Sequence, residues 1–200
     1  MALFIQRLSE KHLPLVDAFC CTETKEDLKE IKAAERRRII NHSKEMEDFL
    51  KKEAIDEQEK SLNTTYLLFE GTEENPTEIV GYISLCNDSI RLDPDEKKMH
   101  KYTYTTVPAL KIARLAVSNN YKGKGIGRNL INFSVFLATK IRIFSGVAFI
   151  TLDCYEHRVS YYEGRGFKRN IIQPIVLPYD SPISMRLVLD EYLENIENQK

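Results

Sequence analysis

Residues 121–131 read YKGKGIGRNLI and combine features that a phosphate-binding loop needs. Three glycines at alternate positions let the backbone adopt positive φ and come close to a ligand. Two lysines and an arginine add positive charge. The apolar run that follows indicates the start of a helix, whose unpaired N–H groups and macrodipole favour an anion. The segment therefore predicts a site for a phosphate-bearing ligand rather than a flexible basic turn.

Two common phosphate-binding motifs do not fit this segment. A P-loop requires G-x-x-x-x-G-K-[ST], and a dinucleotide-binding fingerprint requires G-x-G-x-x-G. Counted from Gly123, both patterns demand a glycine at the position of Arg128. The ligand is therefore expected to be bound by a different kind of glycine loop.

The elements around this loop follow from the hydrophobic pattern. Residues 109–117 predict a strand before the loop, a helix follows over 125–142, and residues 147–153 predict another strand. Strand, loop, helix and strand in this order indicate a parallel crossover. Upstream, strands over 64–70 and 78–86 flank a polar turn and read as an antiparallel hairpin. The chain is therefore expected to be α/β (α+β), with a mixed sheet.

The other predicted elements are more local. They are an edge strand over 3–8, amphipathic helices over 24–40 and 43–58 with a break at Asn41 and an N-cap at Ser43, an exposed loop over 88–107, a short helix over 157–165 ended by Gly166, a β region from Phe167 with a strand over 184–189, and a frayed tail from Glu191.

The composition is typical of a soluble globular protein. Apolar residues make up 42% and charged residues 30% of the 200 residues, and the net charge is −1. Such a balance argues against nucleic-acid binding over the whole surface and leaves room for a local basic patch.

No basic segment leads into a long apolar run, and no run approaches the roughly 18 residues that span a bilayer, so we expect a cytoplasmic chain with no membrane contact. Four cysteines without C-x-x-C spacing favour structural thiols over a metal site.

The stretch from Lys122 to Gly127 resembles the [Q/R]-x-x-G-x-G/A motif of the GNAT family of acetyl-CoA-dependent N-acetyltransferases, with Lys122 in the Gln/Arg position. YYEGRGF (161–167) resembles the family's closing F-Y-E-x-x-G-F motif, at a similar separation from the glycine loop. Residues 64–87 fit the family's hairpin. The likeness covers residues 64–170 by motif and 1–63 by layout only.

The resemblance implies a fold and a domain plan. The GNAT fold has a mixed, mostly antiparallel central sheet of about six to seven strands flanked by helices. Its cosubstrate acetyl-CoA lies in the splay between the strands expected here over 109–117 and 147–153. One domain is then expected over 1–200, made of an N-terminal strand with helices (1–63), an acetyl-CoA-binding core (64–170), a C-terminal strand region (171–190) and a tail (191–200).

The resemblance also implies the cofactor-binding residues. The pantetheine arm would pair with strand backbone and the pyrophosphate with loop N–H groups, which map onto Leu115, Ala116, Val117, Lys122, Gly123, Lys124, Gly125, Ile126, Gly127 and Arg128. Relatives often carry a cofactor-contacting Asn where this chain has Tyr155, and an Ala where it has Arg158. Tyr155 is kept as a cofactor-binding candidate, and this segment's contacts stay open.

Tyr162 matches the family tyrosine that faces the sulfur of coenzyme A, and it is the predicted catalytic residue. Its phenol, with an ordinary pKa of about 10, can donate a proton to the departing thiolate. Tyr161 reads as a core aromatic. The expected reaction is direct attack of a primary amine on the thioester, without a covalent enzyme intermediate.

The acceptor must lose a proton before it attacks. A lysine side chain, with a pKa of about 10.4, is harder to neutralise than an α-amine at about 7.7–8.0. Some relatives place a glutamate base on the strand that corresponds to 109–117, but ALKIARLAV has no carboxylate. This favours an acceptor with a low pKa. Asp153 and Glu156 remain candidate bases, and His157 reads as a surface residue.

Three functions stay open on the sequence. The first is acetylation of a small amine, peptide or protein. The second is acetylation of the α-amine of aminoacyl-tRNA, as in a toxin branch of the family that DFLKKEA (48–54), VGYISL (80–85) and Pro108 resemble. The third is a non-catalytic acetyl-CoA sensor. Five basic residues could meet RNA phosphates or form a solvated helix face: Arg36, Arg37, Arg38, Lys51 and Lys52. A homodimer, an antitoxin partner and the identity of the acceptor are likewise left open.

Overall fold

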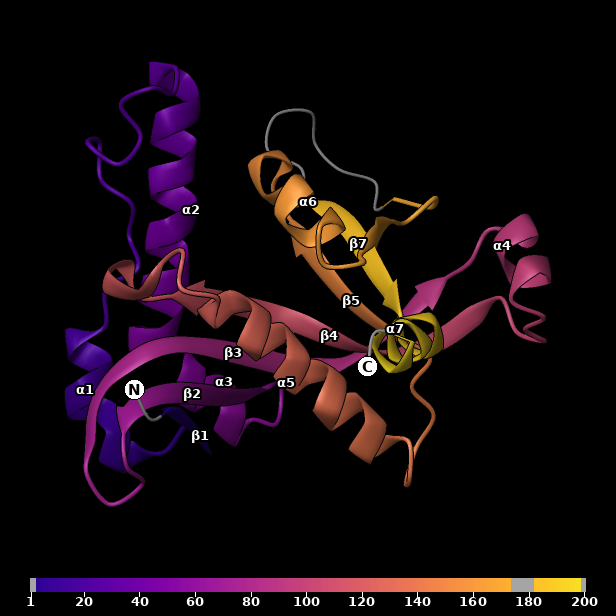
Figure 1. Ribbon diagram of the computed structural model, residues 1–200, viewed down its shortest axis with the longest axis horizontal. Coiled ribbons are helices and arrows are strands. Elements are labelled where there is room, and N and C mark those ends of the chain that lie inside the picture. The colour runs from indigo at the N-terminus through magenta and orange to yellow at the C-terminus, as the bar shows by residue number, and fades with distance from the viewer. Residues whose placement is uncertain (1–2, 174–181, 199–200) are drawn as a thin grey trace. The chain divides into compact units, whose positions relative to one another are not determined.

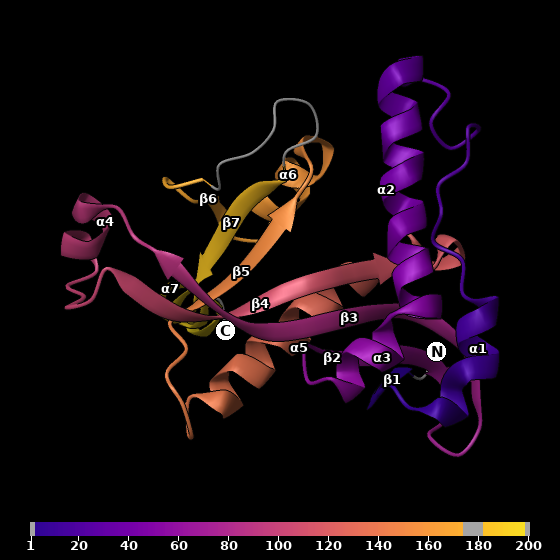
Figure 2. The same ribbon diagram turned by 180° about the vertical axis from the view of Figure 1, so that it is seen from behind.

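A computed structural model describes residues 3–173 and 182–198 of the chain. The elements, shown from opposite sides in Figures 1 and 2, are β1 (Leu3–Arg7), η1 (Glu10–His12), α1 (Leu13–Ala18), α2 (Ala33–Lys52), α3 (Ala54–Glu59), β2 (Thr64–Gly71), β3 (Pro76–Arg91), α4 (Pro94–Met99), β4 (Thr106–Val117), η2 (Asn119–Tyr121), α5 (Ile126–Ile141), β5 (Phe149–Cys154), α6 (Glu156–Glu163), β6 (Lys168–Arg169), β7 (Ile183–Val188) and α7 (Leu189–Glu197). The parts of the predicted N-terminal, strand and tail regions that fall on 1–2, 174–181 and 199–200 lie outside the described residues.

The sheet has seven strands in the order β1-β2-β3-β4-β5-β7-β6. β1 pairs with β2, and β2 with β3, in antiparallel register, which confirms the edge strand and the hairpin. β4 and β5 are parallel, from Ala109 opposite Phe149 to Ile112 opposite Leu152. This confirms the predicted crossover and the mixed sheet.

The chain divides into two compact units. Unit 1 comprises Met1–Leu85 and Arg114–Ile131, and unit 2 comprises Cys86–Ala113 and Asn132–Lys200. β3, β4 and α5 each pass from one unit to the other.

The core of unit 1 lies between the strands and the N-terminal helices. Figure 2 shows α1, α2 and α3 on the near side of β2 and β3. Tyr82 of β3 is fully buried there, and its hydroxyl donates to the carbonyl of Met46 at 2.6 Å. Phe49 of α2 packs against the Tyr82 ring, and the Arg114 guanidinium lies 5.1 Å from the Phe49 ring centre. A bonded hydroxyl lets this large aromatic side chain fill the core without leaving a polar atom unsatisfied.

Unit 2 has its own apolar cluster, which includes Ile90, Val107, Phe149 and Val188. A buried ion pair, Arg186 of β7 with Glu96 of α4, lies in the same unit. Only 7% and 5% of these two side chains is exposed. Arg186 also donates to the side-chain oxygen of Asn170 at 3.0 Å, so its buried charge is supported by more than one acceptor.

The predicted break between two N-terminal helices is wrong. α2 runs without interruption through Asn41 and Ser43, and residues 25–31 form turns and a bend instead of a helix. The Ser43 hydroxyl donates to the carbonyl of Ile40 at 2.9 Å and accepts from the N–H of Glu23 at 2.9 Å. A serine with partners inside the helix and on a neighbouring segment has no need to act as a cap. The break falls instead at Glu53, between α2 and α3.

The predicted exposed loop over 88–107 is also wrong. β3 continues to Arg91, α4 occupies Pro94–Met99, and β4 begins at Thr106. Asp93 caps α4: its carboxylate accepts from the N–H of Asp95 at 2.9 Å, while its own N–H donates to Glu96 at 3.1 Å. This is a capping box followed by proline, a helix-start signal that is visible in the sequence as DPDE.

The C-terminal region departs from the prediction as well. α7 covers Leu189–Glu197, where a frayed tail was expected. Asp190 accepts from Arg142 at 2.6 Å, and the Tyr192 hydroxyl donates to Asn132 at 3.0 Å, so α7 is bonded to α5 and to the residue that follows it. α6 ends at Glu163, and Gly166 takes its positive φ of 89° beyond the helix end. No helix in the described part of the chain is long and apolar enough to cross a membrane.

Candidate functional site

The glycine loop has the backbone conformation that its sequence predicts. Gly123 and Gly125 have φ of 77° and 81°, in the region that other residues rarely adopt. A Cβ placed on either glycine would meet no atom within 4 Å. Both positions therefore require glycine for backbone conformation, and both border open space.

α5 begins directly after these glycines. Its first helical hydrogen bond runs from the N–H of Asn129 to the carbonyl of Gly125, at 3.1 Å. The N–H groups from Gly125 to Arg128 precede that bond and have no helical acceptor. Beside open space, at the positive end of a 16-residue helix, they fit a pyrophosphate.

Gly81 of β3, which was not among the predicted site residues, lets α5 reach this position. A Cβ there would lie 2.9 Å from the Ala116 carbonyl oxygen and 3.2 Å from side-chain carbons of both Ile126 and Leu130. Figure 1 shows the start of α5 lying over β3 and β4. A lone glycine inside a strand pattern marks such a close approach and was a usable signal.

Tyr121, at the start of the glycine loop, is hydrogen-bonded to the β2–β3 hairpin. Its hydroxyl contacts the carboxylates of Glu70 and Glu78, which are cross-strand partners in the hairpin. The hydrogen bonds to Glu70 and then Glu78 raise the pKa of the phenol, so it stays protonated. The ammonium of Lys124 lies 4.8 Å from the Tyr121 ring centre, a cation–π distance.

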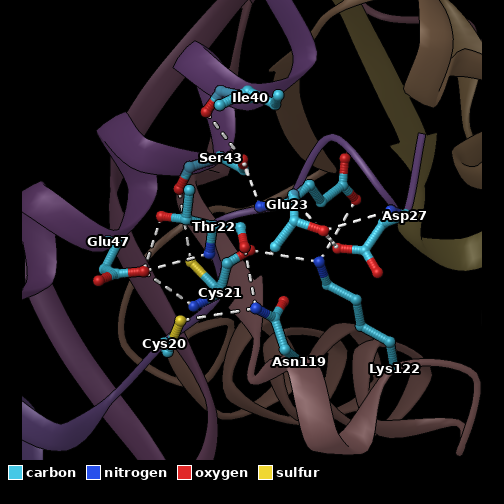
Figure 3. A network of polar contacts seen from close by, with 11 residues as sticks. Cys20, Cys21, Thr22, Glu23, Asp27, Ile40, Ser43, Glu47, Asn119 and Lys122 are labelled. Atoms are coloured by element: carbon cyan, nitrogen blue, oxygen red, sulfur yellow. Dashed lines mark hydrogen bonds and ion pairs between the residues drawn. The ribbon is translucent and has the colours of Figure 1, made fainter. Parts of the chain in front are cut away.

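Lys122 does not join the other loop cations. Its ammonium donates to the carbonyl of Cys21 at 3.2 Å and pairs with the Glu23 carboxylate at 3.4 Å (Figure 3). Of the three cations predicted to face phosphate, Lys122 is thus directed to the segment before α2, Lys124 lies over Tyr121, and Arg128 is exposed.

The end of β4 contains the predicted cofactor-binding residues Leu115, Ala116 and Val117. Ala116 is in the core of unit 1, while Leu115 and Val117 are half-buried. Their backbone contact with the cofactor stays a prediction. Within unit 2, the parallel register of β4 with β5 ends at Ile112 and Leu152, although β5 continues to Cys154. This is where the resemblance places the splay.

Tyr162 belongs to unit 2, and the glycine loop belongs to unit 1. Tyr162 is half-buried on α6, edge-on to Tyr161 and Phe167 with ring centres 5.1 and 5.7 Å away. Its carbonyl accepts from the N–H of Phe167 at 3.2 Å, which fixes the end of the helix. Burial raises the pKa of the Tyr162 phenol, and this group therefore carries its proton throughout the physiological pH range.

The other candidates in unit 2 have defined partners. The Tyr155 ring stacks on His157 with centres 6.2 Å apart. Asp153 accepts from the Lys111 ammonium at 2.6 Å, and Glu156 accepts from Arg169 at 2.7 Å. Both candidate bases therefore form ion pairs. Across residues 3–173 and 182–198, no group of three or more His, Cys, Asp and Glu could hold a metal ion.

Comparison with known proteins finds a matching family model and similar solved structures. A family model described as an acetyltransferase (GNAT) domain matches residues 64–169. A structure of AtaT complexed with acetyl-methionyl-tRNAfMet has a TM-score of 0.71 at 18% identity, and the match covers 98% of this chain and 99% of that one. A tyrosine-to-phenylalanine mutant of KacT has a TM-score of 0.71 at 15% identity, covering 98% and 99%. A mutant AtaT toxin, bound to the C-terminus of the antitoxin AtaR and acetyl-CoA, has a TM-score of 0.64 at 15% identity, covering 97% and 98%.

Proposed function

The chain belongs to the GNAT acetyltransferase family, and we propose that within this family it acetylates the α-amine of aminoacyl-tRNA. It is an acyltransferase whose cosubstrate is acetyl-CoA. The acceptor is the part that we propose.

The extent of the structural match carries this choice of acceptor. The family model spans only residues 64–169, the cofactor-binding core. The match to AtaT with acetyl-methionyl-tRNAfMet spans 98% of the chain, so it includes the helices before the hairpin and the C-terminal elements. These added elements are shared with toxin acetyltransferases, and this favours their type of acceptor over a small amine.

The chemistry of the acceptor points the same way. The described β4 carries no carboxylate, and Asp153 and Glu156 are ion-paired. An α-amine, with a pKa of about 7.7–8.0, is substantially neutral near pH 7.5 without a dedicated base. Aminoacyl-tRNA presents an α-amine, whereas a lysine acceptor would need a base.

In the proposed mechanism, acetyl-CoA supplies the activated thioester. The N–H groups of Gly125, Ile126, Gly127 and Arg128 hold its pyrophosphate, and the backbone of Leu115–Val117 orients the pantetheine arm. The amine lone pair attacks the thioester carbonyl carbon, and the carbon–sulfur bond breaks with its electron pair going to sulfur. Tyr162 donates its phenolic proton to that sulfur, the acetylated nitrogen gives its excess proton to water, and the phenol is reprotonated by solvent.

The test uses acetyl-CoA labelled in the acetyl group, mixed with a total pool of aminoacyl-tRNA and, separately, with uncharged tRNA. We expect label only in the charged pool. Tyr162→Phe should lower kcat by about 10²–10⁴-fold, the usual contribution of a general acid, with unchanged acetyl-CoA affinity by calorimetry.

Tyr161→Phe is the matched control, because Tyr161 is the neighbouring phenol on the same helix. It should keep near wild-type kcat. Label in small amines or protein N-termini, with none in charged tRNA, would reject the proposed acceptor. Acetyl-CoA binding without transfer to any amine would indicate a sensor instead of an enzyme.

A further inference from the structure

The segment over residues 20–27 connects α1 to the region before α2 and has no helix or strand of its own. Figure 3 shows it between α2 on one side and the residues that begin the glycine loop on the other. Its geometry therefore depends on side chains from these two neighbours.

α2 holds the N–H side of this segment. One carboxylate oxygen of Glu47 accepts from the N–H groups of Cys21 at 3.0 Å and Thr22 at 3.1 Å, and from the Thr22 hydroxyl at 2.7 Å. One turn earlier, the Ser43 hydroxyl accepts from the N–H of Glu23 at 2.9 Å. Two successive N–H groups of the segment thus donate to the same carboxylate oxygen.

The start of the glycine loop holds the carbonyl side. The backbone N–H of Asn119 donates to the Cys20 carbonyl, and its side-chain amide donates to the Thr22 carbonyl, both at 2.9 Å. Lys122 donates to the Cys21 carbonyl between them at 3.2 Å, and pairs with Glu23 at 3.4 Å.

Three consecutive peptide groups therefore have the same arrangement. Their N–H groups are bound to α2, and their carbonyl groups are bound to Asn119 and Lys122. A segment bonded on both sides is fixed relative to the loop that it borders. Lys122 thus has its ammonium bound to the carbonyl of Cys21 and the carboxylate of Glu23.

We propose that Asn119 and Lys122 are positioning residues. They fix the 20–27 segment beside the glycine loop, where this segment would contact the acceptor substrate. Lys122 accordingly serves acceptor placement and is not a pyrophosphate ligand. This role rests on the acetyl transfer proposed above. Thr24, Lys25 and Glu26 of the same segment are exposed and present polar and charged groups. When the 20–27 segment is fixed, it places the acceptor amine correctly. This matters because small displacements of the reacting groups strongly slow acetyl transfer.

The test separates the two substrates. Lys122→Gln should raise KM for a total pool of aminoacyl-tRNA by about tenfold, the size expected for loss of a charge-assisted bond, while acetyl-CoA affinity by calorimetry changes less than about twofold. Lys122→Arg should retain the wild-type KM, because a guanidinium can make both contacts. Lys60→Gln is the control: it removes a charge in the same unit, at an exposed side chain that pairs with Asp56 at 2.7 Å. It should leave the KM for charged tRNA unchanged.

Glu23→Gln gives a second variant that leaves the loop sequence intact, and it should raise the same KM without changing acetyl-CoA affinity. The inference is overturned if Lys122→Gln weakens acetyl-CoA binding about tenfold and spares the KM, as a phosphate ligand would. It is equally overturned if Lys122→Gln and Lys60→Gln alter both quantities alike. If the wild-type enzyme transfers no acetyl group to charged tRNA, the proposed acceptor fails, and calorimetry alone still decides whether Lys122 binds the cofactor.

Discussion

Glu47 lies on a charged helix face, yet its carboxylate accepts hydrogen bonds from Cys21, Thr22 and Lys51 in unit 1. Burial alone raises the pKa of this carboxyl, but hydrogen bonds from Lys51, Thr22 and the N–H of Cys21 outweigh burial and lower it to about 2 from 4.5. The carboxylate is therefore charged at every pH at which the protein would act. Its stabilising bonds are made only in the folded state, so its titration reports on folding.

This predicts a pH dependence with a definite sign. Because the folded-state pKa of Glu47 is depressed, its stabilisation is fully present above about pH 4.5 and is lost as the pH falls from there toward about 2. The free energy of unfolding of wild-type protein should therefore exceed that of Glu47→Gln at pH 6, and the difference should shrink below pH 4.5. Urea unfolding at a series of pH values measures this.

Asp48→Asn is the control for the Glu47 measurement. Asp48 is on the same helix and pairs with Lys52 at 2.7 Å, at the surface. Exposed pairs of this kind contribute little, so the Asp48→Asn curve should stay close to wild type. Parallel curves for wild type and Glu47→Gln across the whole range would show that Glu47 makes no special contribution.

Among the elements, α5 depends on strand β3 for its position. The helix brings its N-terminal N–H groups to the glycine loop only because Gly81 lets Ile126 and Leu130 pack directly on the strand. The leucine and isoleucine side chains are both buried, at 0% and 2% exposure. The packing of α5 and the proposed pyrophosphate site therefore both depend on the absence of a side chain at Gly81.

Gly81→Ala should accordingly damage both stability and binding. The new Cβ would lie 2.9 Å from the Ala116 carbonyl oxygen, so α5 or the strand must shift. We expect a loss of about 1–3 kcal/mol in the free energy of unfolding, typical of overpacking, and weaker acetyl-CoA binding by calorimetry.

Gly146→Ala is the matched glycine substitution, because its Cβ would lie 3.4 Å from a side-chain carbon of Pro108. It should leave acetyl-CoA affinity unchanged. Wild-type affinity in Gly81→Ala would mean that α5 does not need its close approach to the sheet.

Over the molecule as a whole, charge is nearly balanced and basic side chains act locally. Of the five predicted RNA-facing residues, Lys51 pairs with Glu47 and Lys52 with Asp48, and Arg36 donates to the carbonyl of Ile31. Arg37 and Arg38 are exposed on α2. The net charge of −1 supplies no general attraction for RNA, so these two arginines are the best candidates for phosphate contacts.

The double variant Arg37→Glu, Arg38→Glu should therefore raise KM for aminoacyl-tRNA, with unchanged acetyl-CoA affinity. The slope of log KM against log salt concentration should fall by about 1 for each RNA phosphate that the variant no longer neutralises. Lys52→Glu, Lys60→Glu changes the net charge equally in unit 1, at residues already paired with Asp48 and Asp56. Equal effects of the two double variants would show that only overall charge matters.

Features that depend on residues close together in the sequence could be predicted from the sequence alone. The positive φ of Gly123 and Gly125, the helix after them, the hairpin and the crossover all follow from local backbone preference and hydrophobic period, and all are present. The capping box at Asp93 was equally local and was missed by reading 88–107 as a loop. The family motifs also placed Tyr162 on a short helix before Phe167.

The partners of polar side chains, in contrast, became known only from the packed structure. Ser43 reads as a cap in the sequence, but the N–H of Glu23, 20 residues earlier, gives it a role inside α2. Lys122 reads as a phosphate ligand, but the Cys21 carbonyl, 101 residues earlier, accepts its hydrogen bond. Hydrogen bonds and ion pairs depend on distance in space, and residues this far apart in the chain are brought together only by the packing of α2 and β4 in unit 1.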